Sequence, residues 1–358
     1  MTPRDRFINQ ALGLPVDRGV LWEDRYWPET LDRWRREGMD SLDGLGNDFR
    51  EMAAHEALPV ATGFWPPFEE RVLEDRGGTL LVQDSYGVHK EVFRQGTGMP
   101  RFVRFPIGSR ADWERLTPRL AADAPGRFAD GWQESARRVA AEGTAPVTLC
   151  GGHLCGFFSF LRELAGDACY TLFYDDPGLV RDMVAFQEDR LCRLIRQATA
   201  AVAVDRLFIW EDMCCRNGPL IGPGMFRQFL FPACQRVIAA AVAGGVKVVD
   251  LDSDGNVDAL IPVWLEAGVN MLHPFEVQAG MDVNRVRRSF GRGFAMRGGV
   301  DKRALAAGRR AIDAELERIR PACLEGRCIP HVDHSVPPDV SWGDYRYYRE
   351  RLARMMGA

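Results

Sequence analysis

Stretches typical of strands and of helices alternate along the chain from about residue 145, and this order limits the folds open to it. Short apolar runs rich in β-branched residues are each followed by an amphipathic pattern, as in parallel strands joined by helices. The predicted strands are residues 145–150, 206–210, 246–251, 270–272, 293–296 and 328–330. The predicted helices between them are residues 177–200, 223–243, 257–267, 283–290 and 302–318.

The number of these units favours a closed barrel over an open sheet. The strands carry no dinucleotide-binding fingerprint, which many open doubly wound sheets have. An α/β barrel commonly exceeds ~250 residues as one domain. We therefore predict an α/β fold, a (β/α)₈ TIM barrel, as one domain over residues 1–358. Residues 141–358 would hold the regular units, and residues 1–140 an N-terminal part with a cap.

The N-terminal part has a different pattern, in which helices are predicted near residues 2–12, 29–38 and 129–142. Residues 78–84 are predicted to form a strand or a hairpin. Aromatic residues crowd this region: Trp22, Tyr26, Trp27, Trp34, Phe64, Trp65 and Phe68. Most are expected to lie in the core under a helical, aromatic-rich extension. Trp65 and Tyr86 are candidates for lining a pocket mouth and binding substrate.

Composition excludes several classes of partner. The net charge of −4 gives no basic surface for nucleic acid. The chain lacks the ~18 consecutive apolar residues that a membrane span needs, and its start lacks a signal-peptide core. The nine cysteines are scattered without a CxxC pair, which favours reduced thiols and a cytoplasmic location. The sequence leaves the oligomeric state open, a homodimer included.

Polar side chains gather where the predicted strands end, which is where barrels of this type place their active sites. Four of the six histidines fall at such ends, and this clustering predicts an enzyme. The residues concerned are His153, Glu211, Asp212, Asp252, Asp254, His273, Glu276, Arg297, His331, Asp333 and His334.

Asp252 and Asp254 follow a buried strand at a spacing that places both side chains on one face. Two like charges there repel each other unless a cation, a proton or a basic group lies between them. The same residues also suit an Asp-rich turn that caps the next helix. Both interpretations stay open at this point.

Other candidates also have structural alternatives. His153 suits a hydrogen bond within its turn, and His273 with Pro274 suits a strand end. Glu211 favours a site role, because a glutamate at the end of an apolar strand is costly to bury unpaired. Two imidazoles flank a carboxylate at residues 331–334, an arrangement that fits metal binding or acid–base chemistry.

Several stretches, taken in their order and spacing, resemble the uroporphyrinogen decarboxylase superfamily. They are Pro3–Phe7, Val16–Arg18, Phe173–Pro177, Gly218–Pro223, Gly280–Val283, Arg297–Lys302 and Pro337–Ser341. The resemblance covers nearly the whole chain and implies a (β/α)₈ barrel. It implies one of two activities, porphyrinogen decarboxylation or zinc-dependent methyl transfer involving corrinoid proteins.

Two departures bear on this choice. Decarboxylases of the superfamily carry an N-terminal arginine-rich signature that holds substrate carboxylates, whereas this chain has Trp22–Trp27. The methyltransferases have His-x-Cys-Gly and a later Cys, where this chain has Asp252-x-Asp254-Gly255 and His334. The resemblance thus implies a divalent metal, zinc or another ion, held by Glu211, Asp252, Asp254 and His334.

We therefore expect a methyltransferase that moves a methyl group between a small methoxy or methylamine compound and a corrinoid protein. The metal would act as a Lewis acid on the leaving group. His331 and His153 would donate protons, Glu276 would orient substrate, and His273 and Arg297 would bind it. The alternatives are a metal-free decarboxylase or other lyase of a small carboxylated substrate, and a ligand-binding barrel without catalysis.

Overall fold

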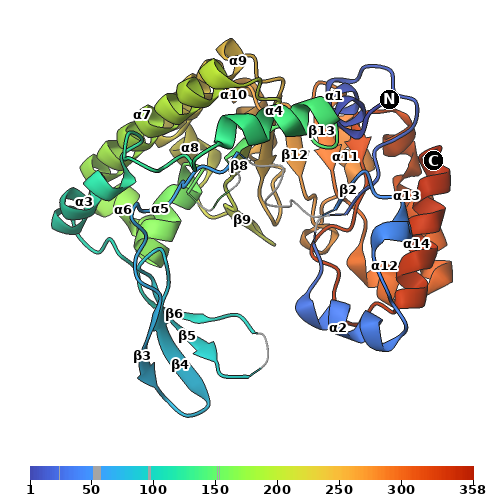
Figure 1. The fold of residues 1–358 in the computed structure, drawn as a ribbon, viewed down its shortest axis with the longest axis horizontal. Helices are drawn as coiled ribbons and strands as arrows, with labels where there is room; N and C mark the ends of the chain where they lie inside the picture. Colours follow the sequence, from blue (N-terminus) through green and yellow to red (C-terminus); the bar gives the residue numbers. More distant parts are fainter. Residues whose placement is uncertain (24, 51–57, 96–97, 151, 153) are drawn as a thin grey trace.

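A parallel sheet forms the centre of the protein in the computed structural model (Figure 1), which describes residues 1–23, 25–50, 58–95, 98–150, 152 and 154–358. In this part of the chain the sheet has six strands, and they follow one another in chain order. They are β7 (Thr148–Cys150), β8 (Arg206–Trp210), β11 (Val248–Asp252), β12 (Met271–His273), β13 (Ala295–Arg297) and β14 (Cys328–Ile329). Each lies within or overlaps a predicted strand, so the predicted alternation is confirmed.

The two edges of this sheet are joined by segments from the N-terminal part. At one edge the amide of Leu58 donates to the carbonyl of Thr148 in β7 at 2.7 Å. At the other, beyond β14, the amide of Val332 donates to the carboxylate of Glu23 at 3.1 Å. Glu23 belongs to β1 (Trp22–Glu23), which pairs in parallel with β2 (Phe49–Arg50). The fold is therefore α/β and TIM-barrel-like, as predicted.

Helices cover the outside of the sheet (Figure 1). The longest, α7 (Pro177–Ala201), begins where predicted, with Asp176 accepting the amide of Leu179 at 2.8 Å and proline in the first turn. The other helices from residue 158 onwards are α5 (Phe158–Ala165), α6 (Cys169–Asp175), α8 (Pro223–Phe229), α9 (Phe231–Ala243), α10 (Ile261–Ala267), α11 (Val283–Phe290), α12 (Lys302–Ala306), α13 (Arg309–Leu324) and α14 (Trp342–Met355). A short hairpin of β9 (Cys214–Cys215) and β10 (Gly218–Pro219) precedes α8.

Two predicted helices are each divided in the structure. The helix predicted at 223–243 becomes α8 and α9, since Pro232 in the first turn of α9 has no amide to continue the preceding hydrogen bonds. The helix predicted at 302–318 becomes α12 and α13, separated by Gly308 at a φ of +89°. The final helix α14 was not predicted, although Ser341 caps it by accepting the amide of Asp344 at 3.1 Å.

The N-terminal part contains the three predicted helices, as α1 (Pro3–Leu12), α2 (Pro28–Arg36) and α4 (Trp132–Glu142). A further helix, α3 (Arg110–Leu116), was not predicted. Of the predicted core aromatics, Trp22, Tyr26, Trp34 and Phe64 are buried, and Trp27 is exposed. The assignment of all residues to one domain stays a prediction.

The predicted strand near residue 80 is β4 (Thr79–Gln83), which belongs to an antiparallel sheet that the sequence did not reveal in full. The sheet order is β3 (Arg71–Asp75), β4, β5 (His89–Phe93), β6 (Arg101–Arg104). It projects from the barrel beside α5 and α6 (Figure 1). Its strands are exposed or half-buried along their length. Their sequences also lack the alternation of apolar and polar residues that identifies a half-buried strand.

Helix α1 closes the amino-terminal end of the barrel. Its Phe7 and Ile8 pack in a small core with the strand residues Val248, Met271, Ala295 and Ile329. Gln10 donates to the carbonyl of Cys328 at 2.5 Å and accepts the amide of Val20 at 2.7 Å. The end opposite α1 is therefore the one at which the strands can present a site.

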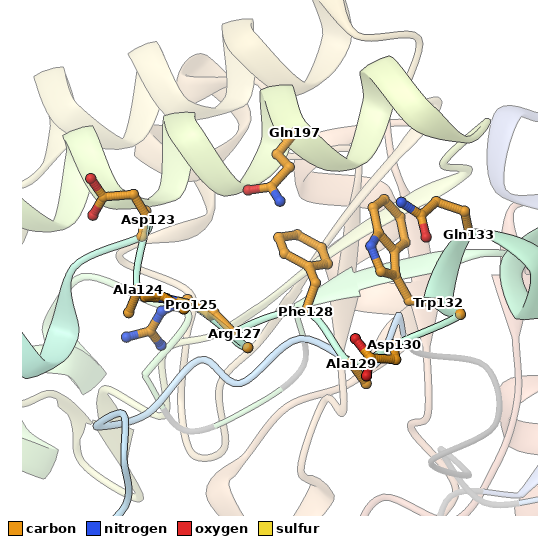
Figure 2. Close-up of a pocket in the computed structure, with 13 residues that line it drawn as sticks. Asp123, Ala124, Pro125, Arg127, Phe128, Ala129, Asp130, Trp132, Gln133 and Gln197 are labelled. Carbon is orange, nitrogen blue, oxygen red and sulfur yellow. The ribbon is translucent and has the colours of Figure 1, made fainter.

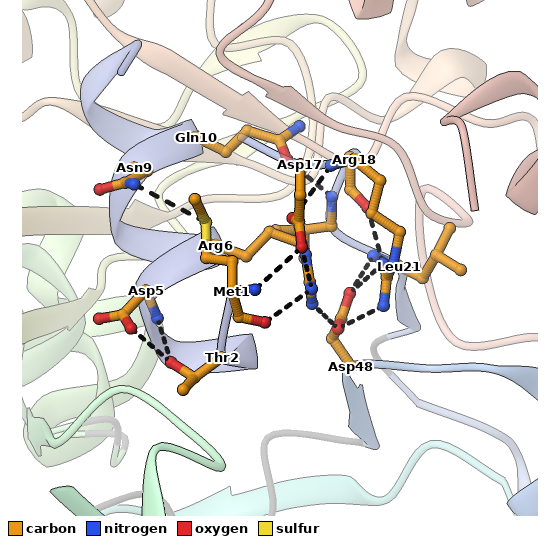
Figure 3. Close-up of polar contacts among 12 residues, drawn as sticks. Met1, Thr2, Asp5, Arg6, Asn9, Gln10, Asp17, Arg18, Leu21 and Asp48 are labelled. Atoms are coloured by element: carbon orange, nitrogen blue, oxygen red, sulfur yellow. Dashed lines mark hydrogen bonds and ion pairs between the residues drawn. The ribbon is translucent and has the colours of Figure 1, made fainter. Parts of the chain in front are cut away.

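A cluster of charged residues fixes α1 to the following segment (Figure 3). The guanidinium of Arg6 contacts Asp17, at 2.8 Å, and Asp48. Asp48 also binds Arg18 at 2.7 Å and accepts the amide of Leu21 at 2.9 Å. Asp48 is thus the shared acceptor of the cluster, and its side chain is only 2% exposed, against 43% for Asp17.

Within the described residues, no helix combines the length and the apolar composition needed to cross a membrane.

We predict that Asp48→Ala destabilises the protein by about 3 kcal/mol, because it leaves two guanidinium groups near a buried position without their carboxylate. The matched control is Asp17→Ala, which removes an exposed partner of the same Arg6 and should have a much smaller effect. Urea unfolding of the two variants checks this. Equal losses in both would contradict the assigned role of Asp48.

Candidate active site

Carboxylates from neighbouring strands meet at the carboxyl end of the barrel. In the sheet register Asp252 lies between Trp210 of β8 and His273 of β12. The amides of Glu211 and Asp212 donate to the carbonyl of Asp252 at 2.9 and 3.2 Å. These hydrogen bonds place the residues after β8 against the end of β11. Asp212 and Asp252 therefore lie at the same mouth.

The loop after β11 brings Asp254 and Glu276 to the same place. Glu276, after β12, accepts the amide of Gly255 at 3.1 Å and has Lys302 Nζ at 3.9 Å. Partial burial, together with the negative charges of Asp252, Asp212 and Glu276, raises the pKa of Asp254 well above its ordinary value. Asp254 is thus suited to hold a proton where an ordinary aspartate is ionised.

His334 faces Asp254 across the mouth, with its Nε2 3.8 Å from Asp254 Oδ2. Its Nδ1 accepts the amide of Ser335 at 2.8 Å, so the neutral ring carries its proton on Nε2. The two side chains are 37% and 39% exposed. The structure thus places an imidazole N–H and a carboxyl with a raised pKa at an accessible position.

Below the mouth, a buried ionic network runs across neighbouring strands. Asp250 binds Arg206 at 2.5 Å and His273 Nδ1 at 2.9 Å. Although burial opposes ionisation, His273, Arg206 and Arg297 hold the pKa of Asp250 well below its ordinary value. His273 Nε2 lies 2.6 Å from Arg297 and 3.6 Å from Asp252 Oδ2. The network therefore reaches from the barrel interior to the carboxylate at the mouth.

This network corrects the predicted role of two residues. His273 and Arg297 were expected to bind substrate, yet His273 is 5% exposed and Arg297 is fully buried. They contact each other and Asp250, and His273 also faces Asp252 while Arg297 lies over the ring of Trp22. They lie behind Asp252, where they can fix its position but not meet a substrate in this arrangement.

Glu211 is not aimed at the mouth, so its prediction as a metal ligand is wrong. Its buried carboxylate accepts the amides of Phe157, Phe158 and Ser159 at 2.8, 2.7 and 3.2 Å. These amides belong to the first turn of α5, which the carboxylate caps. Burial raises the pKa of Glu211 to about 7, although the three amides and Arg162 act in the opposite direction.

The turn at residues 331–334 separates into buried and exposed parts. His331 is fully buried, with Nδ1 2.7 Å from the carbonyl of Val332, so its predicted role as a proton donor to product is wrong. Asp333 accepts the amides of Val277 and Lys302 at 2.8 and 3.3 Å, and burial raises its pKa to about 6. Only His334 of this turn faces the mouth. The predicted catalytic residue His153 lies outside the described residues.

A cavity of about 570 Å³ adjoins the mouth, between the end of β8 and the antiparallel sheet. Five aromatic rings line it: Tyr86, Phe102, Phe105, Tyr170 and Trp210. Asp212 lies in its wall and binds Arg162 at 2.5 Å. The sequence indicated Tyr86 and Asp212 but missed Arg162 and Tyr170, because nothing local shows that α5 and α6 meet the projecting sheet.

Trp65, the other predicted aromatic of a pocket mouth, lies elsewhere. Its indole N–H donates to the carbonyl of Pro125 at 2.7 Å. A second cavity, of about 480 Å³, lies near that segment, between residues 122–131, the start of α4 and Gln197 of α7 (Figure 2). Phe128 and Trp132 pack together beside it at 4.6 Å between ring centroids. This cavity is built from loop and helix residues on the outside of the barrel.

The predicted metal site does not assemble. Within the described ranges, no three side chains of His, Cys, Asp or Glu converge as metal ligands would. Of the four predicted ligands, Asp254 and His334 face each other, whereas Glu211 is held by backbone amides. The described donor set therefore does not fit a divalent ion held by these four residues.

We predict that the stability of the wild-type protein falls by roughly 3 kcal/mol as the pH rises from 4.5 to 7 because of Glu211. In that range the unfolded chain has lost this proton, while the folded chain, with a pKa of about 7, retains it. Glu211→Gln should remove this contribution in urea unfolding and leave those of Asp333 and Asp254, whose pKa values are also raised.

The control for this measurement is Glu317→Gln, which neutralises a glutamate that is 73% exposed and should leave the slope unchanged. If the stability of the wild-type protein instead rises with pH, and Glu211→Gln abolishes that rise, the amides of α5 lower the pKa of Glu211 more than burial raises it.

Comparisons with known proteins agree with the barrel fold. A family model described as uroporphyrinogen decarboxylase (URO-D) matches residues 79–351. The uroporphyrinogen decarboxylase of Rhodococcus erythropolis (strain PR4 / NBRC 100887) is 28% identical over 261 residues, covering 68% of this chain and 67% of the relative.

A solved structure shows the same fold. A methyltransferase from Methanosarcina mazei superposes with a TM-score of 0.62 at 15% identity, covering 98% of this chain and 99% of that one. A B12-independent methionine synthase from Shewanella sp. W3-18-1 is more distant, with a TM-score of 0.44, 11% identity and coverage of 92% and 84%. Because the family model spans most of the chain, the protein belongs to the uroporphyrinogen decarboxylase (URO-D) family.

Proposed function

We propose that the protein is an enzyme that transfers a methyl group from a small methylated compound to the corrinoid of a separate protein. The observation that carries this proposal is the pair at the mouth, Asp254 with its raised pKa and His334 with a proton on Nε2, 3.8 Å apart. In such a pair the carboxyl supplies a proton to a leaving group, and the imidazole N–H donates a hydrogen bond to it. Methyl transfer requires this whenever the leaving atom would otherwise depart as an anion.

In the proposed reaction the bond between the methyl carbon and the substrate heteroatom breaks, and its electron pair stays on the heteroatom. An ether oxygen then takes a proton from Asp254 and leaves as an alcohol or phenol, while the Nε2–H of the neutral His334 ring donates a hydrogen bond at the same position. An amine that enters as an ammonium leaves neutral without taking a proton. The corrinoid, when its carrier protein is bound, supplies the electron-rich centre that accepts the methyl group.

The buried network supports this acid by fixing the charges around it. Asp250 forms an ion pair with Arg206 and also contacts His273 Nδ1. The other ring nitrogen of His273, Nε2, lies 3.6 Å from Asp252. Asp252 in turn is one of the carboxylates that raise the pKa of Asp254. His273 and Asp250 are therefore positioning residues. No step of this mechanism passes through a metal, because the described donor set does not form the predicted site.

Exposed apolar residues on the antiparallel sheet and just before β6 support a protein partner. Val72, Phe93, Met99, Phe102 and Val103 are each at least 46% exposed. Exposed apolar residues that gather on one element are typical of surfaces that bind another protein. Met99 and Phe102 also line the cavity beside the mouth, so a protein that binds around them would lie next to the proposed acid.

Decarboxylation of a carboxylated substrate is less well supported. Among the described residues that line the cavity, five carboxylates face two cationic side chains, and each of these already binds a carboxylate. This balance repels an anionic substrate. The segment that carries arginines in the decarboxylases is here partly core, since Trp22 and Glu23 are fully buried.

We predict that Asp254→Asn lowers the rate of methyl transfer from a methoxy donor by about 10²–10⁴-fold, the usual contribution of a general acid. His334→Gln, which removes the imidazole hydrogen-bond donor, should lower this rate by a smaller factor. The assay follows methylation of free cob(I)alamin spectroscopically, with a methoxylated aromatic compound as donor. The wild-type rate should fall as the pH rises through the raised pKa of Asp254, because only the protonated carboxyl can donate. This fall should be absent in Asp254→Asn.

The matched control is Glu317→Gln, a neutralised carboxylate on the exposed surface of α13, which should keep the wild-type rate. Asp254→Asn with wild-type activity would overturn the assignment of the acid. Release of CO₂ from a carboxylated substrate, abolished by the same variant, would replace methyl transfer by the decarboxylase alternative.

A further inference from the structure

The cavity beside the mouth has aromatic walls that come from distant parts of the chain. Tyr86 lies between β4 and β5, Phe102 lies in β6 with Phe105 just beyond it, and Tyr170 lies in α6. Trp210 ends β8 and completes the set. The barrel and the projecting sheet thus both contribute rings to one enclosure. Ring faces carry partial negative charge and attract cations.

The rings stay neutral at physiological pH. Burial raises the pKa of Tyr170 to about 12, with smaller contributions from Cys169 and Asp167. Burial likewise raises the pKa of Tyr86, and Glu163 and Asp84 act in the same direction. Both phenols therefore keep their protons. The negative charge of the cavity comes from its carboxylates alone.

The charged side chains of the cavity are strongly unequal. Its described lining contains two cations, and each is matched: Lys90 lies 3.0 Å from Asp84, and Arg162 lies 2.5 Å from Asp212. Three further carboxylates line it, Glu70, Glu163 and Asp167, so the net formal charge of the lining is −3. An anionic ligand would be repelled, and a neutral ligand would gain nothing from this charge.

We propose that this cavity binds the methylated ammonium group of the methyl donor. A quaternary or tertiary methylammonium has a large apolar surface and a spread positive charge, which suits aromatic faces backed by carboxylates. Lys90 and Arg162 each have N–H groups that bind a carboxylate at short distance. A methylammonium group has few or no N–H groups, so it can bind without a hydrogen bond to a carboxylate. This inference rests on the proposed methyl transfer and names its substrate class.

The position of the cavity fits this use. Asp212 lies in the cavity wall and is also one of the carboxylates that raise the pKa of Asp254. Trp210 is paired in register with Asp252 at the mouth. The Arg162 guanidinium already lies over the Trp210 ring, at 5.6 Å from its centroid, so the cation would sit among the other rings. A methylammonium group in this cavity therefore lies next to the mouth, where its methyl group can be presented to an acceptor.

The test uses the full chain and two probes of the same shape, choline and its neutral isostere 3,3-dimethylbutan-1-ol, in isothermal titration calorimetry. We expect choline to bind in the millimolar range or tighter. It should bind at least ~10-fold more tightly than the isostere, which lacks the charge. Tyr170→Leu and Asp167→Asn should each weaken choline binding ~3-fold or more, and Asp167→Asn should leave binding of the isostere unchanged.

The matched control is Asp189→Asn, which neutralises an exposed carboxylate on α7 and should leave choline binding unchanged. Thermal unfolding of each variant verifies that it is folded. Equal binding of both probes would overturn the charge selection and leave an apolar pocket. Absence of choline binding to the folded wild type would overturn the site.

These outcomes are separate from those of the proposed function, because the binding measurement needs neither a corrinoid nor turnover. Asp254→Asn should lose methyl transfer from a methoxy donor and still bind choline. Loss of choline binding with intact transfer from a methoxy donor would remove this inference and keep the proposed function. Choline binding without any methyl transfer would keep this inference about the cavity and remove the proposed function.

Discussion

The ionised carboxylate of Asp250, buried inside the barrel, joins the strands on which the site depends. It takes Arg206 from β8 and His273 from β12, with Arg297 of β13 at 3.6 Å. A buried charge of this kind is tolerated only when its partners satisfy it, and removing one of them leaves an uncompensated charge. The network therefore fixes the relative positions of four neighbouring strands, and with them the residues that follow each strand at the mouth.

The carboxylates near this network differ in chemistry because their neighbours differ. Asp250 is surrounded by cations, which keep it ionised. Glu211 and Asp333 are buried against backbone amides, where they serve the structure. Asp254 meets other carboxylates and holds its proton more tightly. The role of each carboxylate is therefore decided by its interaction partners and not by its residue type or its place at a strand end. Segments distant in the sequence supply those partners.

This explains how far the sequence could predict the protein. The strands, the start of α7 at Pro177 and the convergence of acidic residues on one edge follow from local patterns and from barrel geometry. The direction of Glu211 does not, since the chain turns sharply after β8 and Asp212 adopts a φ of +39°. The cavity could not be predicted from local patterns either. Some of its aromatic rings come from a sheet whose strands lack a clear alternation of apolar and polar residues, and the others come from the barrel. Tertiary contacts between remote segments decide both.

The charge of a ligand in the cavity affects the pKa of Asp254 if that ligand is a cation. Asp212 belongs to both places, and its negative charge helps to keep Asp254 protonated in the empty site. A methylammonium group seated against the cavity wall would offset part of that charge, so the pKa of Asp254 would fall. The ammonium donor does not use this proton, because it leaves as a neutral amine. Transfer from a methoxy donor does require protonated Asp254, so the two kinds of donor should differ in pH dependence.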